Sequence, residues 1–597
     1  MKIIQHISCL LFITCACCCF HAAAQENETY FLHTIEKGQS LYSISSMYGV
    51  SQADIVKLNP GSNEKIYVGR TLRIPRILTN AVKETFHTIE KGETLYRLTV
   101  KYGVSAKLIC EANPGLSADN FRIGEVIRIP SEKEQILSGE PVPAESSTAA
   151  TTLPASVESR CRSMHKVKRK ETVYSISRKY AISEAELIAA NPELKGEDKI
   201  KKGTLLCIPY PAQETTDTDK SKLPPTDSEL FDANKTPWKR ISTVRAAIIL
   251  PFLEGGEQNK TTLRTVEYYE GFLMAVDSLK RKGVSIDLYT YNSGNDKNTL
   301  NAILAKPEMT RMDVIFGPLH PVQIKPLADF ADRHNIRLVI PFTSKDNTVF
   351  QNPSIYQVNT PQSYLYSEVY NHFVRQFPAA HVIFVEATND TQEKADFIKG
   401  LKDELYNHGI PSATIPESAT ADELKTLLRA DRQNIFLPTS GSNITLIKIL
   451  PQLTLLVRSN PEAAVHLFGY PEWQTYTKDH LEAFFELDTY FYSSFYTNNL
   501  LPASIRFIHN YRKWYGKEMD DSYPRFGMLG FDTGFFFLNG LWRYGSNFEQ
   551  KMQEMSLIPI QTGFKFERVN NFGGFINRKV FFVHFTRNYE LLKLDYD

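Results

Sequence analysis

The chain has 597 residues, with 68 Lys and Arg against 67 Asp and Glu, so its formal net charge is only +1. This balance excludes a strong overall electrostatic bias toward nucleic acid. A hydrophobic content of 42% with 12% aromatic residues excludes a disordered chain and predicts a globular protein of several domains.

Residues 1–24 are typical of a cleavable export signal. Lys2 supplies positive charge, an apolar stretch runs over residues 7–20, and small alanines precede Gln25. A membrane anchor is disfavoured because this stretch is shorter than the ~20 residues that span a bilayer. Lipid attachment at a cysteine of the segment is disfavoured because the preceding residues make a poor lipobox. We expect export to the periplasm or cell envelope, with no transmembrane span after signal removal.

Three segments of similar length repeat one pattern and are named motif 1 (31–75), motif 2 (86–130) and motif 3 (164–209). Each begins with His-x-Ile or His-x-Val, continues through Ser/Thr-Leu/Val-Tyr and Asn-Pro, and ends at Ile-Pro. Alternation at the start, helical spacing after a Ser or Thr N-cap, and the two prolines predict strand, helix, helix, strand. The initial histidines are predicted to pack in the strands.

The three repeats resemble the lysin motif (LysM) over their full length, as small α+β (βααβ) domains. The resemblance implies binding of N-acetylglucosamine glycan, which is peptidoglycan for an exported bacterial chain. It places the sugar between the first strand-to-helix loop and the loop after the second helix, where backbone amides can hydrogen-bond N-acetyl groups. Lys170 and Ala181 replace glycines, so motif 3 departs most from the pattern. The implied glycan-binding residues are Gly38, Gln39, Ser40, Leu41, Asn59, Pro60, Gly61, Gly92, Glu93, Thr94, Leu95, Asn113, Pro114, Gly115, Glu171, Thr172, Val173, Asn191 and Pro192.

The mature chain keeps three cysteines, Cys110, Cys161 and Cys207. Cys207 occupies the slot held by arginine in motifs 1 and 2, and Cys161 lies just before the first strand of motif 3. Because these two strands pair antiparallel in the resembled fold, the resemblance implies a Cys161–Cys207 disulfide in an oxidising compartment. Cys110 aligns with apolar residues and is expected to stay reduced.

The segments that flank motif 3 differ in composition from the repeats. Residues 131–163 and 210–240 are rich in Ser, Thr, Pro, Ala and Glu, and we predict extended, mobile linkers there. From residue 241 to 597, apolar strands alternate with amphipathic helices. This rhythm predicts an α/β domain with parallel sheets, and its length predicts two lobes.

Short segments of this domain resemble type 1 periplasmic binding proteins, the branched-chain amino-acid receptor group. They include Tyr-Glu-Gly at 269–271, Gly-Pro-Leu at 317–319, Leu-Val-Ile-Pro-Phe at 338–342 and Gly-Phe-Asp-Thr-Gly at 530–534. In such folds a ligand binds between the lobes, at the carboxyl ends of parallel strands. The hydroxyls at 343–344 match the role of a carboxylate grip, whereas the histidine at 320 departs from an amino-acid site. The cleft residues implied are Tyr291, Asn292, His320, Thr343, Ser344, Glu386, Ser440, Tyr470 and Trp473.

The rival interpretation is a cell-wall hydrolase that the repeats deliver to its substrate. The chain has no cysteine after residue 207, and it has no H-E-x-x-H, His-x-His or G-x-S-x-G. We therefore predict a non-enzyme without cofactor or metal that tethers a receptor-like domain to peptidoglycan, with a small molecule and an envelope protein as further partners and no nucleic acid. Two alternatives stay open: a LysM-targeted wall hydrolase with two carboxylates, and a scaffold whose cleft has lost its ligand.

Overall fold

The computed structural model divides the chain into two units, residues 1–140 with 227–597, and residues 141–226. The predicted signal and residues 131–162 of the predicted linker lie outside the described residues. Among the described residues, no helix is both long and apolar enough to cross a membrane. The structure describes residues 30–36, 39–63, 66–75, 85–130, 163–167, 172–180, 187–188, 190–191, 204–208, 225–235, 237–253, 259–388, 393–499, 501–555 and 557–596.

Motifs 1 and 2 have the predicted order of strand, helix, helix, strand. The strands pair antiparallel in each motif, and Ser40 and Thr94 cap the first helices by accepting a hydrogen bond from the backbone amide three residues on. The elements are β1 (Tyr30–Thr34), α2 (Leu41–Tyr48), α3 (Gln52–Leu58) and β2 (Thr71–Pro75) in motif 1, and β3 (Thr85–Thr88), α4 (Leu95–Tyr102), α5 (Ala106–Ala112) and β4 (Val126–Ile129) in motif 2.

Motif 3 contains β5 (Ser163–Lys166), α7 (Val173–Tyr180) and β6 (Leu205–Ile208). The strands pair antiparallel, and Cys207 stands opposite Met164 in the register. This is the pairing on which the disulfide prediction depends, but Cys161 and the Cys207 side chain lie outside the described residues. Cys110 is a free, half-buried thiol, and burial raises its pKa to about 11.

The first lobe of the large domain is built on a seven-stranded sheet of order β17-β18-β11-β10-β9-β7-β8, in which β17 alone runs antiparallel to its neighbour. Apolar runs place every residue of β9 and most of β7 in its core. The strands are β7 (Thr243–Leu250), β8 (Ser285–Asn292), β9 (Val314–Phe316), β10 (Arg337–Ile340), β11 (Ile355–Gln357), β17 (Phe566–Arg568) and β18 (Phe575–Asn577). The helices are α10 (Lys260–Arg281), α11 (Lys297–Leu304), α12 (Pro321–Arg333), α18 (Pro502–Tyr515), α19 (Phe526–Tyr544) and α20 (Phe548–Lys551), with 3-10 turns η2 (Met309–Arg311), η3 (Thr348–Phe350), η5 (Gly545–Asn547) and η6 (Met552–Glu554).

Two of the singled-out sequence segments meet where α10 packs against α19. A Cβ at Gly271 would lie 1.7 Å from the Gly527 carbonyl oxygen, and one at Gly530 would lie 1.9 Å from that of Tyr268. Only glycine allows this close approach of two helix backbones. Asp532 is buried and accepts three backbone hydrogen bonds, from the amides of residues 560, 561 and 562.

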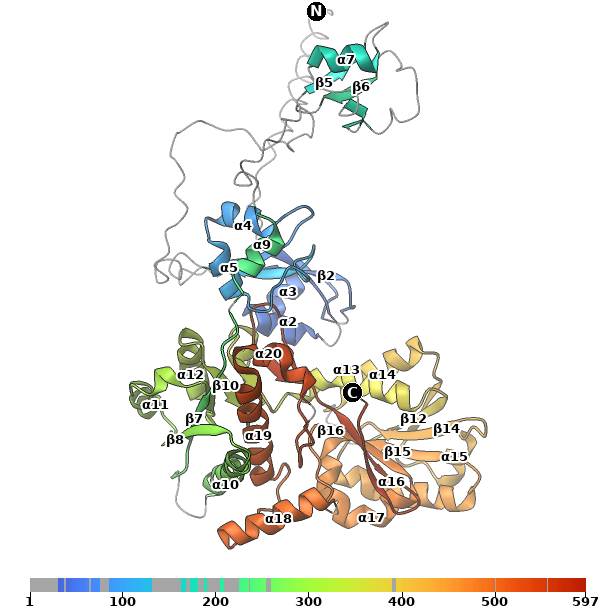
Figure 1. The fold of residues 1–597 in the computed structure, drawn as a ribbon. Coiled ribbons are helices and arrows are strands. Elements are labelled where there is room, and N and C mark those ends of the chain that lie inside the picture. Colours follow the sequence, from blue (N-terminus) through green and yellow to red (C-terminus); the bar gives the residue numbers. More distant parts are fainter. Residues whose placement is uncertain are drawn as a thin grey trace, which may run out of the picture. The chain divides into compact units, whose positions relative to one another are not determined.

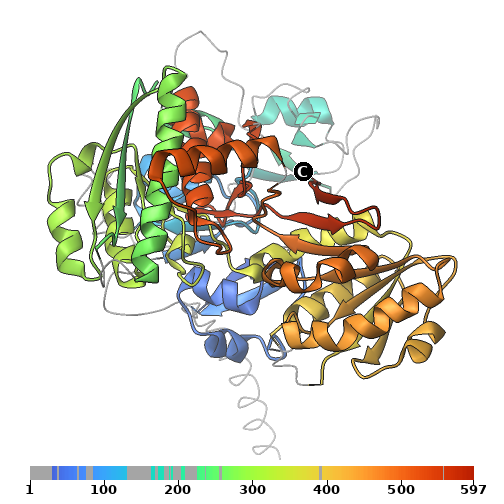
Figure 2. The ribbon, with the colours of Figure 1, turned by 90° about the horizontal axis from the view of Figure 1, so that it is seen from below.

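The second lobe has the same design. Its sheet has the order β13-β12-β14-β15-β16-β19-β20, in which the first five strands are parallel and β19 pairs antiparallel with both β16 and β20. Figures 1 and 2 show β12 to β16 of this lobe in yellow and orange, with the red β19 and β20 beside them. The strands are β12 (Ala380–Glu386), β13 (Ser412–Pro416), β14 (Gln433–Pro438), β15 (Val465–Gly469), β16 (Thr489–Ser493), β19 (Phe581–Phe585) and β20 (Leu591–Leu594), and the helices are α13 (Gln362–Gln376), α14 (Ala395–Asn407), α15 (Ala421–Thr426), α16 (Asn443–Ser459) and α17 (Thr477–Glu486), with η4 (Pro471–Tyr476). The predicted two-lobed α/β architecture is confirmed.

The chain passes between the lobes at three places, which follow from the strand memberships. These are the connections from β11 to α13, from β16 to α18, and from β18 to β19. Each lobe is therefore assembled from segments far apart in the sequence. The three connecting segments together form the hinge between the lobes. This is the arrangement in which one lobe can rotate against the other.

The predicted linker 210–240 needs a correction, because residues Asp227–Ala233 form a helix, α9. Phe231 is only 6% exposed and packs against Phe121 of motif 2, at 6.0 Å between ring centroids. Figure 1 shows α9 in green against the blue α4 and α5, and it contacts both. Seven residues with two adjacent apolar side chains show no periodicity, so composition alone suggested a linker.

Motifs 1 and 2 are also packed against the first lobe through an aromatic joint. Phe572, in the turn between β17 and β18, lies 5.1 Å from the Phe86 ring and 6.4 Å from the Tyr48 ring. Phe31, Tyr48 and Phe86 are buried in the same hydrophobic cluster as Phe572. Motifs 1 and 2 therefore belong to one packed unit with the large domain.

Candidate glycan grooves and inter-lobe cleft

A hydrogen-bond network joins the initial histidine of each repeat to a tyrosine 15 residues later. Tyr48 Oη lies 2.7 Å from His33 Nδ1, and the equivalent distances are 3.0 Å at His87 and 2.9 Å at His165. All three histidines are about 95% buried, at 4–5% exposure. Their predicted packing role is confirmed, and the 15-residue spacing was visible in the sequence.

The second ring nitrogen of the histidine holds a residue of the predicted groove loop. His33 Nε2 is hydrogen-bonded to Gln39 Oε1 at 2.8 Å, and His87 Nε2 to Glu93 Oε2 at 2.6 Å. Burial lowers the pKa of both histidines, opposed by the Gln39 hydrogen bond in one case and by the Glu93 hydrogen bond and charge in the other. Gln39 and Glu93 therefore shape the groove loop by binding the core histidine.

The asparagine of each Asn-Pro pair has its side chain turned into the motif. Asn113 is fully buried, donates to the carbonyls of Ile109 and Arg128 at 2.7 Å, and accepts from the Arg128 amide at 2.7 Å. Asn59 makes the same three bonds in motif 1. Asn191 is buried at 2% exposure in motif 3. In motifs 1 and 2 these side chains join the last strand to the second helix, a role that the sequence resemblance did not separate from glycan contact.

The remaining groove residues lie in the predicted loops. Motifs 1 and 2 differ there in what contacts the glycine after Asn-Pro. Around Gly61 of motif 1, no heavy atom of the described residues lies within 4 Å of an added Cβ. At Gly115 of motif 2, an added Cβ would meet Arg568 at 2.7 Å and Asn571 at 3.0 Å. The Gly115 amide donates to the Asn571 carbonyl oxygen at 2.8 Å, and the Leu95 amide donates to Asp227 Oδ1 at 2.7 Å.

The other predicted groove residues differ in exposure, and some of them are not described. Pro60, Gly92 and Pro114 are exposed. In motif 3, Thr172 is exposed and Val173 is half-buried at the start of α7. Gly38, Glu171 and Pro192 lie outside the described residues.

In the large domain, the predicted cleft residues of the first lobe lie at the carboxyl end of β8 or soon after the ends of β9 and β10. Tyr291 donates to Glu308 at 2.7 Å, and burial, with Glu308 adding to it, raises its pKa. Asn292 accepts from the Phe252 amide at 2.9 Å. His320 precedes α12, and the Thr343 hydroxyl accepts from the Lys345 amide at 3.3 Å beside half-buried Ser344.

In the second lobe, the predicted residues fall into an open pair and a buried pair. Glu386 is exposed at the end of β12, and Ser440 accepts from the Ser442 amide at 3.3 Å after β14. Tyr470 and Trp473 are instead fully buried in the hydrophobic core of the lobe, and Tyr470 donates to the Pro438 carbonyl at 2.7 Å. A large aromatic directly after a buried strand continues the core, so these two do not line a cleft in this structure.

The cavities at the inter-lobe boundary have a different lining. One of about 330 Å³ lies between α10, η4, α17 and the segment before α19. A second, of about 240 Å³, lies at the hinge and includes Leu319, Pro341 and Phe342, the neighbours of predicted residues. Arg264 lines both cavities. None of the nine predicted cleft residues is among the described residues lining these two cavities.

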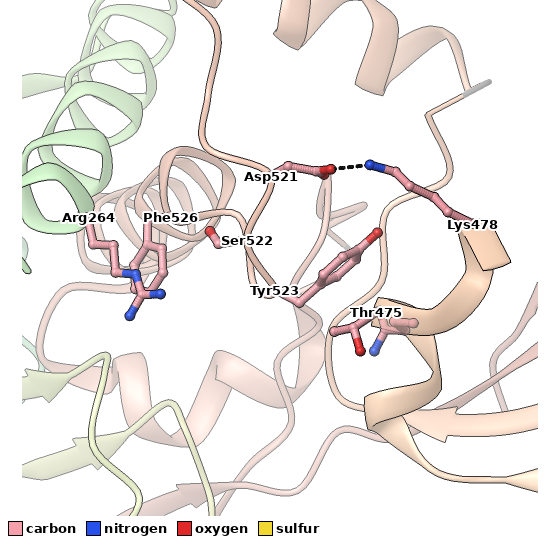
Figure 3. A pocket seen from close by; sticks show the side chains of 8 residues that line it. Arg264, Thr475, Lys478, Asp521, Ser522, Tyr523 and Phe526 are labelled. Atoms are coloured by element: carbon pink, nitrogen blue, oxygen red, sulfur yellow. Dashed lines mark hydrogen bonds and ion pairs between the residues drawn. The ribbon is translucent and has the colours of Figure 1, made fainter. Parts of the chain in front are cut away.

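Figure 3 shows the first cavity, with Arg264 beside Phe526 on one side and Lys478 reaching toward Asp521 on the other. The Arg264 guanidinium lies 5.4 Å from the Phe526 ring, and no ion pair to it is found among the described residues. Lys478 of the second lobe and Asp521 of the first are paired at 2.5 Å. This hydrogen bond and its charge lower the pKa of Asp521. An ion pair thus bridges the mouth of the cleft.

Arg264 was missed because it lies in the first turns of a long helix, 14 residues after the end of β7 in the sequence (264 − 250). Residues at strand ends lie in loops, whereas Arg264 lines the two cavities from within helix α10. The Arg264–Phe526 pair joins positions 262 residues apart in the sequence (526 − 264), and no local pattern links them.

Comparison with known proteins addresses the repeats directly. The LysM domain model matches residues 33–75, 87–130 and 165–209. An autolysin of Enterococcus faecalis is 30% identical over 105 residues, which are 16% of this chain and 14% of the autolysin. An N-acetylmuramoyl-L-alanine amidase of Staphylococcus epidermidis is 26% identical over 162 residues, 27% of this chain and 45% of the amidase. The chain thus spans less than half the length of these relatives.

Solved structures similar to the large domain include a branched-chain amino acid ABC transporter protein from Rhodospirillum rubrum, at 12% identity and a TM-score of 0.42 over 59% of this chain and 100% of that chain. A periplasmic ligand-binding protein of a branched-chain amino acid ABC transporter from Burkholderia xenovorans has 12% identity and a TM-score of 0.38 over 59% and 96%. These scores carry no weight for function. The family match, the threefold pattern and the βααβ geometry agree, and the three repeats are LysM domains.

Proposed function

We propose that this protein is a non-catalytic envelope protein that binds N-acetylglucosamine glycan, as in peptidoglycan, through its LysM domains and carries a two-lobed receptor domain on the same chain. The single observation that supports glycan binding most is the match of three LysM domains. The relatives named as an autolysin and an amidase match this chain over only 14% and 45% of their own length, so their catalytic activity is not carried over. Export by a signal at residues 1–24 and location in the periplasm or cell envelope belong to the same proposal.

Binding to the insoluble polymer tests the glycan part. Several glycan-binding motifs on one chain are expected to raise avidity roughly 10²–10⁴-fold over a single motif. The mature full chain should sediment with purified peptidoglycan and be released by soluble chitopentaose. A chain that stays in the supernatant contradicts glycan binding, and a fall in turbidity of the peptidoglycan suspension would favour the hydrolase alternative.

For the large domain, we propose a hinge-type receptor for a small anionic ligand. Arg264 offers an exposed guanidinium to two cavities at the lobe boundary, and Lys478 and Asp521 bridge the lobes across one of them. A ligand that binds both lobes would shift the hinge toward the closed form. Thr343 and Ser344 remain proposed hydroxyl contacts, because they follow β10 at the same boundary.

A thermal-shift screen tests the receptor proposal. The probes are the amino acids and short mono- and dicarboxylates, each added to the mature full chain. A ligand that raises the melting temperature should lose about tenfold or more in affinity with Arg264→Ala, because one charged hydrogen bond is worth about 1.5–3 kcal/mol. Removal of the hydroxyls at 343 and 344 should cost roughly 1–3 kcal/mol of binding. Lys297→Ala, an exposed cation on α11, is the matched control.

If no carboxylate raises the melting temperature, the scaffold alternative replaces the receptor. In that case the cleft would serve contacts with an envelope protein. Small-angle scattering gives a second measurement, since a ligand that closes the hinge should compact the chain.

A further inference from the structure

The groove of motif 2 is occupied by hydrogen-bond acceptors of the same chain. Its two facing loops each present a backbone amide, at Leu95 and at Gly115. Asp227 Oδ1 accepts from the first at 2.7 Å, and the Asn571 carbonyl oxygen accepts from the second at 2.8 Å. Both loops that would hold a sugar are therefore already bound.

Helix α9 is held in this position from both of its ends. Phe231 joins the core of motif 2, with Leu230 packed against the same cluster. A few residues later, Trp238 donates through its indole nitrogen to the Tyr544 carbonyl at 3.0 Å, and the Lys239 backbone exchanges two hydrogen bonds with Ser546. The helix thus joins motif 2 to the first lobe over a short stretch of chain.

The Asn571 turn approaches motif 2 from the other side. Its side-chain amide donates to Glu125 Oε2 at 3.2 Å and to the Val126 carbonyl at 3.3 Å, and its carbonyl takes the Gly115 amide. The neighbouring Phe572 is buried against Phe86. These contacts combine hydrogen bonds with apolar burial, so the turn is a specific joint and not a loose contact.

Motif 1 offers the contrast within the same unit. Leu41, the counterpart of Leu95, is half-buried, whereas Leu95 is fully buried. Gly61, the counterpart of Gly115, faces open space among the described residues. Motif 1 packs on the first lobe through other residues, with the Tyr42 hydroxyl accepting from Asn347 at 3.1 Å.

An acetamido group binds a protein amide through its carbonyl oxygen, the same type of acceptor as an aspartate or backbone oxygen. A sugar entering motif 2 would have to displace two such acceptors and separate α9 from its apolar contacts. We propose that α9 and the Asn571 turn close motif 2 to glycan, so that it serves as the joint between motif 1 and the receptor domain while motifs 1 and 3 hold glycan. This inference rests on the glycan-binding function proposed above.

Hydrogen exchange of the full chain tests the closure without any glycan. The Leu95 amide should exchange about ten- to a hundredfold more slowly than the Leu41 amide, and Asp227→Ala should remove that difference. Asp232→Ala changes an exposed carboxylate on the same helix and should leave the Leu95 rate unchanged. Equal exchange at Leu95 and Leu41 in the unmodified chain would overturn the proposal.

Calorimetric titration of the full chain with chitopentaose tests the consequence for binding. We expect at most two sites per chain, with one removed by Pro60→Trp. Asp227→Ala combined with Phe231→Ala should open one further site, and Pro114→Trp in that background should remove it again. Three sites in the unmodified chain would refute the closure, and no gain in the opened variant would refute the part of it that is assigned to α9. If no variant binds chitopentaose, the glycan function fails, and the exchange rates still decide whether α9 closes the groove.

Discussion

Motifs 1 and 2 share a fold, a His–Tyr pair and an asparagine that fastens the last strand, yet they differ in what meets their groove loops. Motif 1 presents Gly61 to open space among the described residues, whereas motif 2 has Gly115 against Asn571 and Leu95 bound to Asp227. Both motifs contact Phe572 through one aromatic ring each. Repeats with the same internal structure can therefore take different roles, because the residues that fold a LysM domain are distinct from those that decide what covers its groove.

The largest expected effect comes from removing the ring that both motifs share. Phe572→Ala should lower the free energy of unfolding by about 3–5 kcal/mol, since Phe572 is 1% exposed and its loss leaves a cavity. Hydrogen exchange should then speed up in both motifs. Tyr589→Ala, which truncates a ring that is 75% exposed, is the control. Faster exchange in motif 2 alone would show that motif 1 does not depend on the joint.

The buried asparagine of motif 2 should matter more than its counterpart in motif 1. Asn113→Ala should cost about 2–3 kcal/mol because it leaves the buried Ile109 carbonyl and the part-buried backbone groups of Arg128 without the Asn113 side chain. Asn59→Ala breaks the same three bonds at a part-exposed position, where water can replace the side chain. We expect a cost nearer 1 kcal/mol there, by urea denaturation of each variant. Equal costs would mean that burial does not distinguish the two motifs.

Alanine at Gly61 and at Gly115 should have different effects, because the first strains the local backbone and the second disturbs the contact of motif 2 with the β17–β18 turn. Gly61→Ala should cost about 1 kcal/mol, because φ is +89° there and an L side chain is strained. Gly115→Ala should cost about 1–3 kcal/mol because its Cβ would press on Arg568 and the Asn571 backbone. Only the second change should increase hydrogen exchange in the β17–β18 turn. Faster exchange in that turn on Gly61→Ala would contradict the interpretation that only the Gly115 loop contacts it.

The smallest expected effect is a difference in pH dependence. The pKa values of His33 and His87 are lowered by burial below the ordinary value of 6.5, so the unfolded chain takes up the proton first. The stabilisation from the neutral rings is present above about pH 6.5 and is lost as the pH falls, by at most ~1.4 kcal/mol per pH unit for each histidine. Glu93 opposes the shift at His87 alone, so motif 1 should lose more stability on acidification than motif 2.

Exchange rates in each motif at pH 7.0 and 5.5 measure this difference. His33→Gln should make motif 1 less sensitive over that range, because the buried imidazole no longer titrates. Greater acid sensitivity in motif 2 would show that the Glu93 charge does not govern His87.

The sequence by itself determined the local structure of the repeats and the class of the large domain. The repeats are shaped by helix caps at Ser40 and Thr94, by strand alternation and by the Asn-Pro breaks. These features act between residues close in the chain, so the sequence alone reveals them. The alternation of apolar strands and amphipathic helices predicted two α/β lobes for the same reason. Glycines such as Gly271 and Gly530 were also noticed, although their purpose, a helix contact, was not.

Only the tertiary structure decided which groove loops meet distant residues and which residues line the cavities at the lobe boundary. Asp227 meets Leu95 across 132 residues, and Asn571 meets Gly115 across 456 residues (571 − 115). The same holds for Arg264, which approaches Phe526 at the lobe boundary, and for Trp473, which packs inward at 0% exposure. Such contacts depend on how distant elements pack, and a cap or a periodicity carries no information about a partner that lies hundreds of residues away.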